Sequence, residues 1–118
     1  MHSLLPGTIL TSSWKQNMNF EILKLNYFDD EVLAVSVDYF AISPNISKRF
    51  DKEINYALDK LVENPLAYFN IQIKPYRRIV IRSFPFAIIY RVESNLGYVM
   101  LLFPLKDDPA KLFKQLIQ

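Results

Sequence analysis

The stretch between Ser43-Pro44 and Asn64-Pro65 constrains the fold of this chain more than any other. Its apolar residues recur at helical spacing and charged residues fill the remaining positions, which predicts an amphipathic helix. Ser43 can cap this helix with Pro44 at its first position, and Asn64-Pro65 ends it. Such a helix buries its apolar stripe only by packing on another layer of structure. The stripe consists of Phe50, Ile54, Ala57, Leu58, Leu61 and Val62.

The residues before this helix predict a strand and a first helix. Residues 20–27 alternate between apolar and polar side chains well enough for a strand. Asp29 and Asp30 are expected to cap a helix that runs to about Ile42. This helix has weak intrinsic propensity because it contains several β-branched valines, so packing must hold it.

The C-terminal half predicts three strands and a final helix. The strands are expected at about 77–82, 86–93 and 98–105, with a turn at 94–97 and a closing helix after Asp107-Asp108-Pro109. The whole order is therefore β-α-α-β-β-β-α. It predicts an α+β fold with a mainly antiparallel, four-stranded sheet and the two N-terminal helices packed on one face.

The hairpin at 77–93 concentrates charge. Folding it about Phe84-Pro85 gives one face that is wholly apolar and one that mixes arginines with apolar residues. Like charges ~6 Å apart repel by roughly 2–3 kcal/mol at an effective dielectric near 20. These arginines are therefore either neutralised locally, by Glu93 or Asp107, or kept for an anionic partner. The expected register sets Arg82 opposite Ala87, Val80 opposite Ile89, and Arg78 opposite Arg91.

This charged face is the predicted contact surface for a macromolecule. The partner is expected to present an acidic amphipathic segment, because the face carries both arginines and apolar side chains. The primary contact residues are Arg78, Arg82, Arg91 and Lys106, and the secondary ones are Val80, Ile89, Met100 and Phe113, with Leu102 beside them.

Composition excludes several kinds of chemistry. The chain has no cysteine, and its one histidine is His2, so thiolate metal sites and a histidine-based catalytic centre are not expected. Gly7 and Gly97 are the only glycines, too few for a glycine-rich phosphate loop. No apolar run approaches the ~18 residues of a membrane span. The sequence therefore assigns no catalytic residue, metal or cofactor, and predicts a cytoplasmic protein without a membrane partner.

The first 17 residues differ from the rest of the chain. Residues 1–17 contain Pro6-Gly7 and Thr11-Ser12-Ser13 but no acidic side chain, and their apolar stretch is too short for a secretory signal. Patterned sequence begins at Met18. We therefore expect an N-terminal extension at 1–17 outside the core and one domain at 18–118.

Three fragments of the chain resemble RelE/ParE-type toxins, which are often labelled plasmid stabilisation proteins. The run YRRIVIRSFPFAIIYRVE at 76–93 is similar to the strand pair typical of these toxins. FDKEINYALDKLVENPLAYF at 50–69 resembles their second helix, and PLKDDPAKLF at 104–113 resembles their final strand and helix. The resemblance covers about 18–117. It implies the toxin of a type II toxin–antitoxin pair, held inactive by a cognate antitoxin.

The resemblance also separates two branches of activity. RelE-like members cut messenger RNA on the ribosome, whereas ParE-like members poison DNA gyrase. This chain has Ala87 and Asp107 where the ribonucleases carry arginines, Phe113 where a catalytic tyrosine can occur, and Pro104 in place of a frequent histidine. Because cleavage needs a base and a stabiliser of developing charge, the resemblance favours a gyrase-directed or degenerate toxin that is not an enzyme.

Two alternatives remain open at this stage. One is a ribosome-dependent mRNA endonuclease that uses the basic residues with an atypical base. The other is a non-toxic protein-binding module. The expected partners are the antitoxin and either gyrase or the ribosome with its messenger RNA, with the chain in a homodimer or in a toxin–antitoxin hetero-oligomer.

Overall fold

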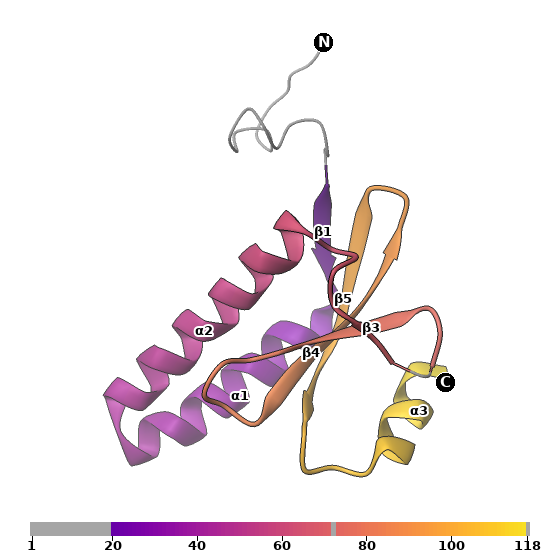
Figure 1. Ribbon diagram of the computed structural model, residues 1–118. Helices are drawn as coiled ribbons and strands as arrows, with labels where there is room; N and C mark the ends of the chain where they lie inside the picture. Colours follow the sequence, from indigo (N-terminus) through magenta and orange to yellow (C-terminus); the bar gives the residue numbers. More distant parts are fainter. Residues whose placement is uncertain (1–19, 72, 118) are drawn as a thin grey trace.

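The computed structural model describes residues 20–71 and 73–117, in which three helices surround one sheet (Figure 1). The predicted extension at 1–17 and the domain start at Met18 lie outside the described residues. The elements in chain order are β1 (Glu21–Lys24), α1 (Asn26–Ile42), α2 (Pro44–Glu63), β2 (Phe69–Asn70), β3 (Tyr76–Val80), β4 (Phe86–Glu93), β5 (Leu96–Pro104) and α3 (Pro109–Ile117).

The sheet has the strand order β1-β5-β4-β3-β2. β1 runs parallel to β5, and every other neighbouring pair is antiparallel. The α+β fold and its order of elements are confirmed, but the sheet has five strands rather than four. The extra strand β2 consists of Phe69 and Asn70 only, which is too short for an alternating pattern to reveal it.

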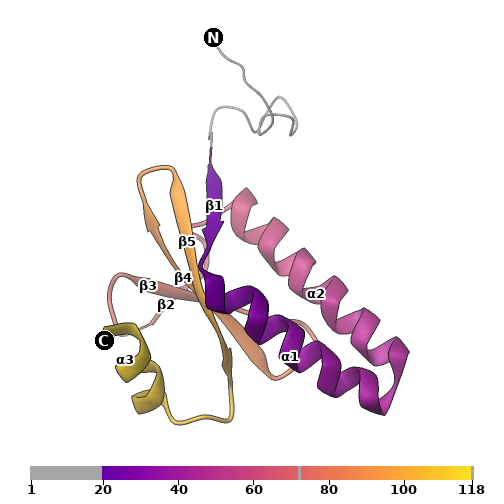
Figure 2. The same cartoon turned by 180° about the vertical axis from the view of Figure 1, so that it is seen from behind.

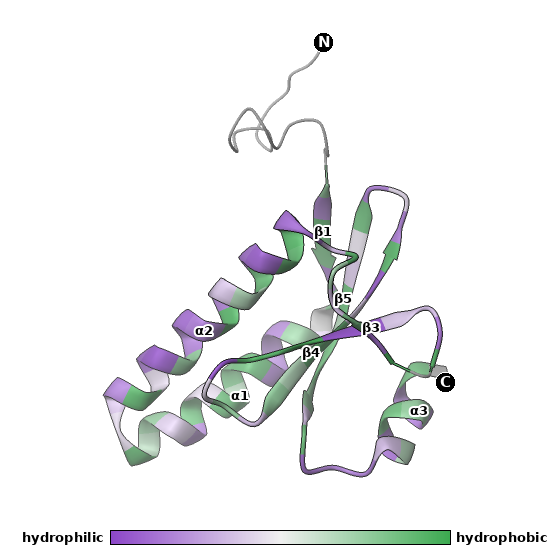
Figure 3. Ribbon diagram, in the orientation of Figure 1, coloured by the Kyte–Doolittle hydropathy of each residue, from purple (hydrophilic) through white to green (hydrophobic). Residues whose placement is uncertain are grey.

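The helices cover both faces of the sheet. α1 and α2 pack on one face, as predicted, and α3 lies against the other (Figure 2). Hydropathy follows this division, with hydrophobic residues on the side of α2 that faces the sheet and hydrophilic ones on its outer side (Figure 3). The main core includes Phe28, Phe50, Leu61, Ile88, Tyr90 and Val99, and the smaller core under α3 joins Leu112 to Ile89, Leu101 and Phe103.

The first helix begins earlier than the sequence predicts. α1 starts at Asn26 with Leu25 as its N-cap residue, so the expected cap at Asp29 and Asp30 is wrong. The reason is that the Leu25 N–H donates to the Val99 carbonyl at 3.1 Å, which fixes the chain at the end of β1. Asp29 instead pairs with Lys24 at 3.2 Å.

The caps of the other two helices follow the sequence. The Ser43 hydroxyl accepts the Asn45 N–H at 3.2 Å, with Pro44 as the first residue of α2. The helix ends at Glu63, before Asn64-Pro65. The Asp108 carboxylate accepts the Ala110 N–H at 3.0 Å at the start of α3. These short-range signals were sufficient to place both helix starts.

The β3–β4 hairpin is shifted by two residues from its predicted register. Val80 lies opposite Ala87, Arg78 opposite Ile89 and Tyr76 opposite Arg91. The connection is longer than predicted because Phe84 is buried, with its ring centroid 5.3 Å from that of Phe50 and Ser83 at φ 66°. A shift of two residues preserves which side chains share a face within the paired strands.

A β-bulge alters the predicted faces of β5. The pairing passes from Ile89–Leu101 to Tyr90–Val99, so Met100 has no partner across the ladder. Met100 and Leu101 therefore both lie on the α3 side, whereas Leu102 is buried in the main core. The prediction that Leu102 belongs to the charged face is wrong.

Candidate functional site

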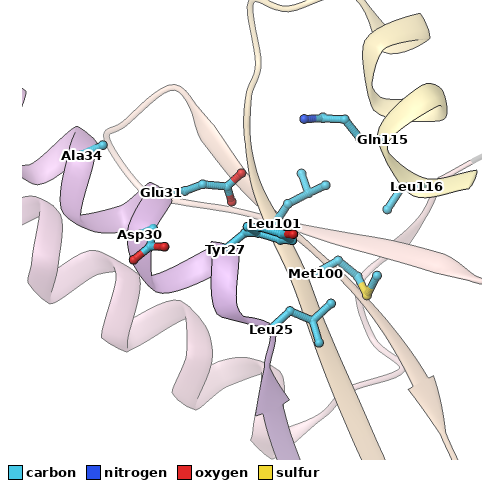
Figure 4. A pocket seen from close by; sticks show the side chains of 9 residues that line it. All are labelled: Leu25, Tyr27, Asp30, Glu31, Ala34, Met100, Leu101, Gln115 and Leu116. Atoms are coloured by element: carbon cyan, nitrogen blue, oxygen red, sulfur yellow. The ribbon is translucent and has the colours of Figure 1, made fainter. Parts of the chain in front are cut away.

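A groove of about 560 Å³ lies between α1, β5 and the end of α3 (Figure 4). Met100 and Leu101 of β5 lie opposite the side chains of α1, and α3 borders them on the other side (Figure 4). The groove thus combines apolar side chains with two carboxylates and one amide. The lining residues are Leu25, Tyr27, Asp30, Glu31, Ala34, Met100, Leu101, Gln115 and Leu116.

Glu31 fixes the α1 wall of the groove to the sheet. Its carboxylate accepts the Leu102 N–H at 2.8 Å. β1 pairs with β5 only as far as Lys24 and Val99. Beyond this pair, the Glu31 side chain supplies the acceptor for the β5 backbone N–H that a neighbouring strand would otherwise provide. Burial raises the pKa of the Glu31 carboxyl above its ordinary value, and the bond from Leu102 opposes that rise.

The outward face of α1 extends this apolar surface. Five large apolar side chains of the helix are 57% to 72% exposed, although a surface helix normally turns such residues to the core. α1 carries four carboxylates and neither lysine nor arginine. Leu33, Val37 and Phe40 are spaced i, i+4 and i+7 and so form one stripe on the outward side of α1, whereas Tyr27 and Ile42 lie on other sides of the helix. Exposed apolar side chains of this kind mark an interaction surface. The five residues are Tyr27, Leu33, Val37, Phe40 and Ile42.

The predicted contact residue Arg82 does not lie with the other arginines. It follows β3 and turns to α2, where its guanidinium donates to the Glu53 carboxylate at 2.8 and 3.2 Å. The same guanidinium lies 3.7 Å from the centroid of the Tyr56 ring. The three arginines therefore do not share one face, because the strand ends at Val80 and the period of two no longer applies beyond it.

Of the other three basic residues, Arg78 and Arg91 keep the predicted shared face as diagonal neighbours on β3 and β4, whereas Lys106 lies apart from them. Arg91 pairs with Glu93 at 2.8 Å and lies over the Tyr98 ring, which is the local neutralisation that the sequence analysis considered. Arg78 lies over the ring of Phe69. Lys106 is exposed in the turn after β5. This turn lies beside the start of β4, whereas Arg91 lies near the end of that strand. The structure does not bring the four residues together.

The secondary residues also separate. Val80 and Phe113 are about half exposed, whereas Ile89 is buried in the small core under α3. Met100 is the one predicted residue that lines the groove. Ile89 is inaccessible because α3 covers part of the face that the hairpin alone leaves open.

Sequence reasoning missed the residues that shape the site. Tyr27 and Glu31 lie in α1, whose apolar residues are spread around the whole helix. The absence of a separate polar face was the signal in the sequence that part of this helix is an exposed apolar surface. Arg77 and Tyr90 were missed as well. Arg77 donates to the Leu66 and Tyr68 carbonyls, and the Tyr90 hydroxyl donates to the Pro65 carbonyl at 2.7 Å, so both hold the chain that follows α2.

The comparisons with known proteins bear on the fold. No model of a known protein family matches the sequence, and no curated protein matches it. A chain in a solved structure described as "Chromosomal ParDE TA system from P. aeruginosa" is similar to this chain with a TM-score of 0.67 and 15% sequence identity. The match covers 75% of this chain and 99% of that one. The chain therefore shares its fold with that chain of a ParDE system.

Ala87, Asp107 and Phe113, which the sequence resemblance marks as departures from ribonuclease side chains, have different surroundings in the structure. Ala87 is fully buried between Val80 and Phe103, which leaves its position without a charged group. Asp107 pairs with Lys111 at 3.1 Å. Phe113 is half exposed and cannot transfer a proton. None of these three positions provides a cation, and the one ionisable side chain among them, Asp107, is engaged by Lys111.

Two further findings concern the described part of the chain. Within residues 20–71 and 73–117, no group of three or more histidine, cysteine, aspartate or glutamate side chains is placed to hold a metal ion. No helix in the same residues is long and apolar enough to cross a membrane.

Proposed function

We propose that this chain is the toxin of a toxin–antitoxin pair and that its antitoxin docks in the groove and along the outward face of α1. The observation that carries this proposal is that the stripe of Leu33, Val37 and Phe40 adjoins the groove. Asp30 and Ala34, which line the groove, lie one turn before Leu33 and Val37 on α1. The similarity in fold to a chain of a ParDE system is consistent with it.

The charges around the groove define the partner. Asp30 and Glu31 line it, and Asp38 lies farther along the same helix. A segment that covers this surface must therefore bring apolar side chains for the groove and lysines or arginines for its rim. This is the opposite charge from the acidic segment expected against the arginines. Arg78 and Arg91 remain a second candidate contact.

We infer that the toxin acts by binding its target, as a gyrase-directed toxin does, and not by cutting RNA. The support comes from Ala87, Asp107 and Phe113, which replace two cations and a proton-transfer group. A toxin that works by binding requires none of these groups. It requires an accessible surface that the antitoxin can cover.

The experiment is growth of cells that express the full chain, alone and with any short open reading frame that adjoins its gene. We expect the chain alone to stop growth and the neighbour to restore it. Ala34→Arg places a long cation in the groove at an exposed position, so it should retain toxicity but escape neutralisation. Ala110→Arg makes the same change at an exposed position of α3 outside the groove, so it should still be neutralised.

Each failure has its own meaning. Unchanged growth of cells that express the wild-type chain would reject the proposal that the chain is a toxin. Neutralisation of Ala34→Arg that is as complete as that of Ala110→Arg would reject the groove as the antitoxin docking site. If Arg78→Glu with Arg91→Glu escapes neutralisation while Ala34→Arg does not, the arginine surface is the docking site.

A further inference from the structure

The N-terminal half of α2 carries a second hollow, separate from the groove. The hollow has a volume of about 550 Å³ and shares no lining residue with the groove. Its residues are spaced i, i+3, i+4 and i+7, so they form one stripe on the exposed side of the helix. They are Asn45, Lys48, Arg49 and Lys52.

The positive charge of this stripe is not neutralised within the described residues. Across 20–71 and 73–117, none of Lys48, Arg49 and Lys52 takes part in an ion pair. Glu53 follows Lys52 on α2, but both of its carboxylate oxygens accept hydrogen bonds from Arg82. Three like charges thus lie together on one helix without an ion pair in the described residues, although Glu53 still attracts Arg49 and Lys52. Such a cluster costs stability unless an anion is bound.

Two observations strengthen the local field. The first turn of α2 contains no acidic residue, so the positive end of the helix dipole adds to the three cations. The pKa of the Glu53 carboxyl is lowered, first by the hydrogen bond from Arg82 and further by the charges of Arg82, Arg49 and Lys52. Arg49 and Lys52 therefore stabilise negative charge on this side of α2.

The lining identifies the class of anion. A protein partner would need an apolar centre to its interface, and all four lining side chains here are polar or charged. Lysine, arginine and asparagine are the side chains that contact phosphate oxygens in nucleic acids. We propose that the α2 stripe binds the phosphate backbone of a nucleic acid, without reading its sequence, on a surface that stays free when a partner fills the groove.

The test is the salt dependence of binding of the full chain to a short fluorescent DNA duplex. Lys48→Ala with Lys52→Ala removes two phosphate contacts, so the slope of log K against log salt should fall in magnitude by about 1.8. Lys74→Ala with Lys114→Ala removes the same charge at two exposed lysines outside the hollow and should leave the slope unchanged. Arg49 is retained because its guanidinium also lies over the Phe84 ring.

Three results would overturn the proposal. The first is no binding of the duplex at low salt. The second is an equal loss of slope in the two double variants, which would show that net charge alone is responsible. The third is displacement of the duplex by polyglutamate of matched charge at the same concentration as by unlabelled duplex, which would assign the surface to acidic polypeptides. None of these results depends on toxicity or on the groove.

Discussion

The carboxylate of Glu31 on α1 accepts the backbone N–H of Leu102 on β5 at 2.8 Å. The bond joins residues from the two halves of the chain at the point where β5 has lost its parallel neighbour. It holds the first helix against the sheet edge and so fixes one wall of the groove. Burial destabilises the ionised form of the Glu31 side chain. The stability that this bond contributes therefore depends on pH.

Glu31→Gln should keep the acceptor for Leu102 and remove the charge. Because the folded-state pKa of Glu31 is raised, the folded chain holds the proton more tightly than the unfolded chain. The wild-type carboxyl therefore loses stabilisation as pH rises from its ordinary value of 4.5 through the raised one. We expect Glu31→Gln to be at least as stable as the wild type at pH 7 in urea unfolding, with the difference vanishing at low pH.

Glu31→Ala is the matched control for that prediction. It removes the acceptor and leaves a partly buried N–H unsatisfied, so it should cost about 1–3 kcal/mol at low pH. The cost should be smaller at pH 7, because the ionised wild-type carboxyl is itself less stabilising there. A glutamine variant that is as unstable as the alanine variant at pH 7 would contradict the account.

Tyr90→Phe should lower the free energy of unfolding by about 0.5–1.5 kcal/mol at neutral pH, because the Pro65 carbonyl loses its donor. Burial raises the pKa of Tyr90 to about 12, from 10.0 in an ordinary tyrosine. The contribution of the hydroxyl is complete below pH 10 and is lost as pH rises toward 12, because the unfolded chain ionises first. Unfolding measured between pH 9 and 12 should show the two proteins converging. A constant difference across that range would refute this assignment.

Ser36 and Ser47 form the buried polar contact between α1 and α2, with their hydroxyl oxygens 2.8 Å apart. Either serine changed to alanine should destabilise the chain by about 1 kcal/mol, because the other hydroxyl stays buried without its partner. The double alanine variant should be close to wild type. Thermal or urea unfolding of the wild type, the two single variants and the double variant gives the coupling free energy between the two serines. Additive losses would show that water already satisfies both hydroxyls.

The free chain should not cut messenger RNA on ribosomes, even where it stops growth. Loss of a single stabiliser of developing charge typically costs ~10²–10³ in rate. None of Ala87, Asp107 and Phe113 is a cation, and neither Ala87 nor Phe113 can transfer a proton. Primer extension on stalled ribosomes should show intact messages. Cuts in the messenger RNA at defined codon positions that disappear with Arg78→Ala would instead support the ribonuclease alternative. Accumulation of DNA breaks with intact messages would support the gyrase-directed branch.

The sequence by itself determined the order of all elements except β2, the helix caps at Ser43 and Asp108, and the division of the β3–β4 hairpin into two faces. Each of these depends on side-chain period or on hydrogen bonds within a few residues. A register shift of two residues did not disturb the faces of the paired strands, because a shift by the full side-chain period leaves every paired residue on its own side.

Tertiary structure alone decided which of those side chains are accessible. The burial of Phe84 lengthened the hairpin connection and sent Arg82 to Glu53, and the bulge at Ile89/Tyr90 moved Leu102 into the core. α3 then covered Ile89, and the bond between Glu31 and Leu102 formed the groove. These outcomes depend on contacts between residues far apart in the chain, whose energies no local pattern records.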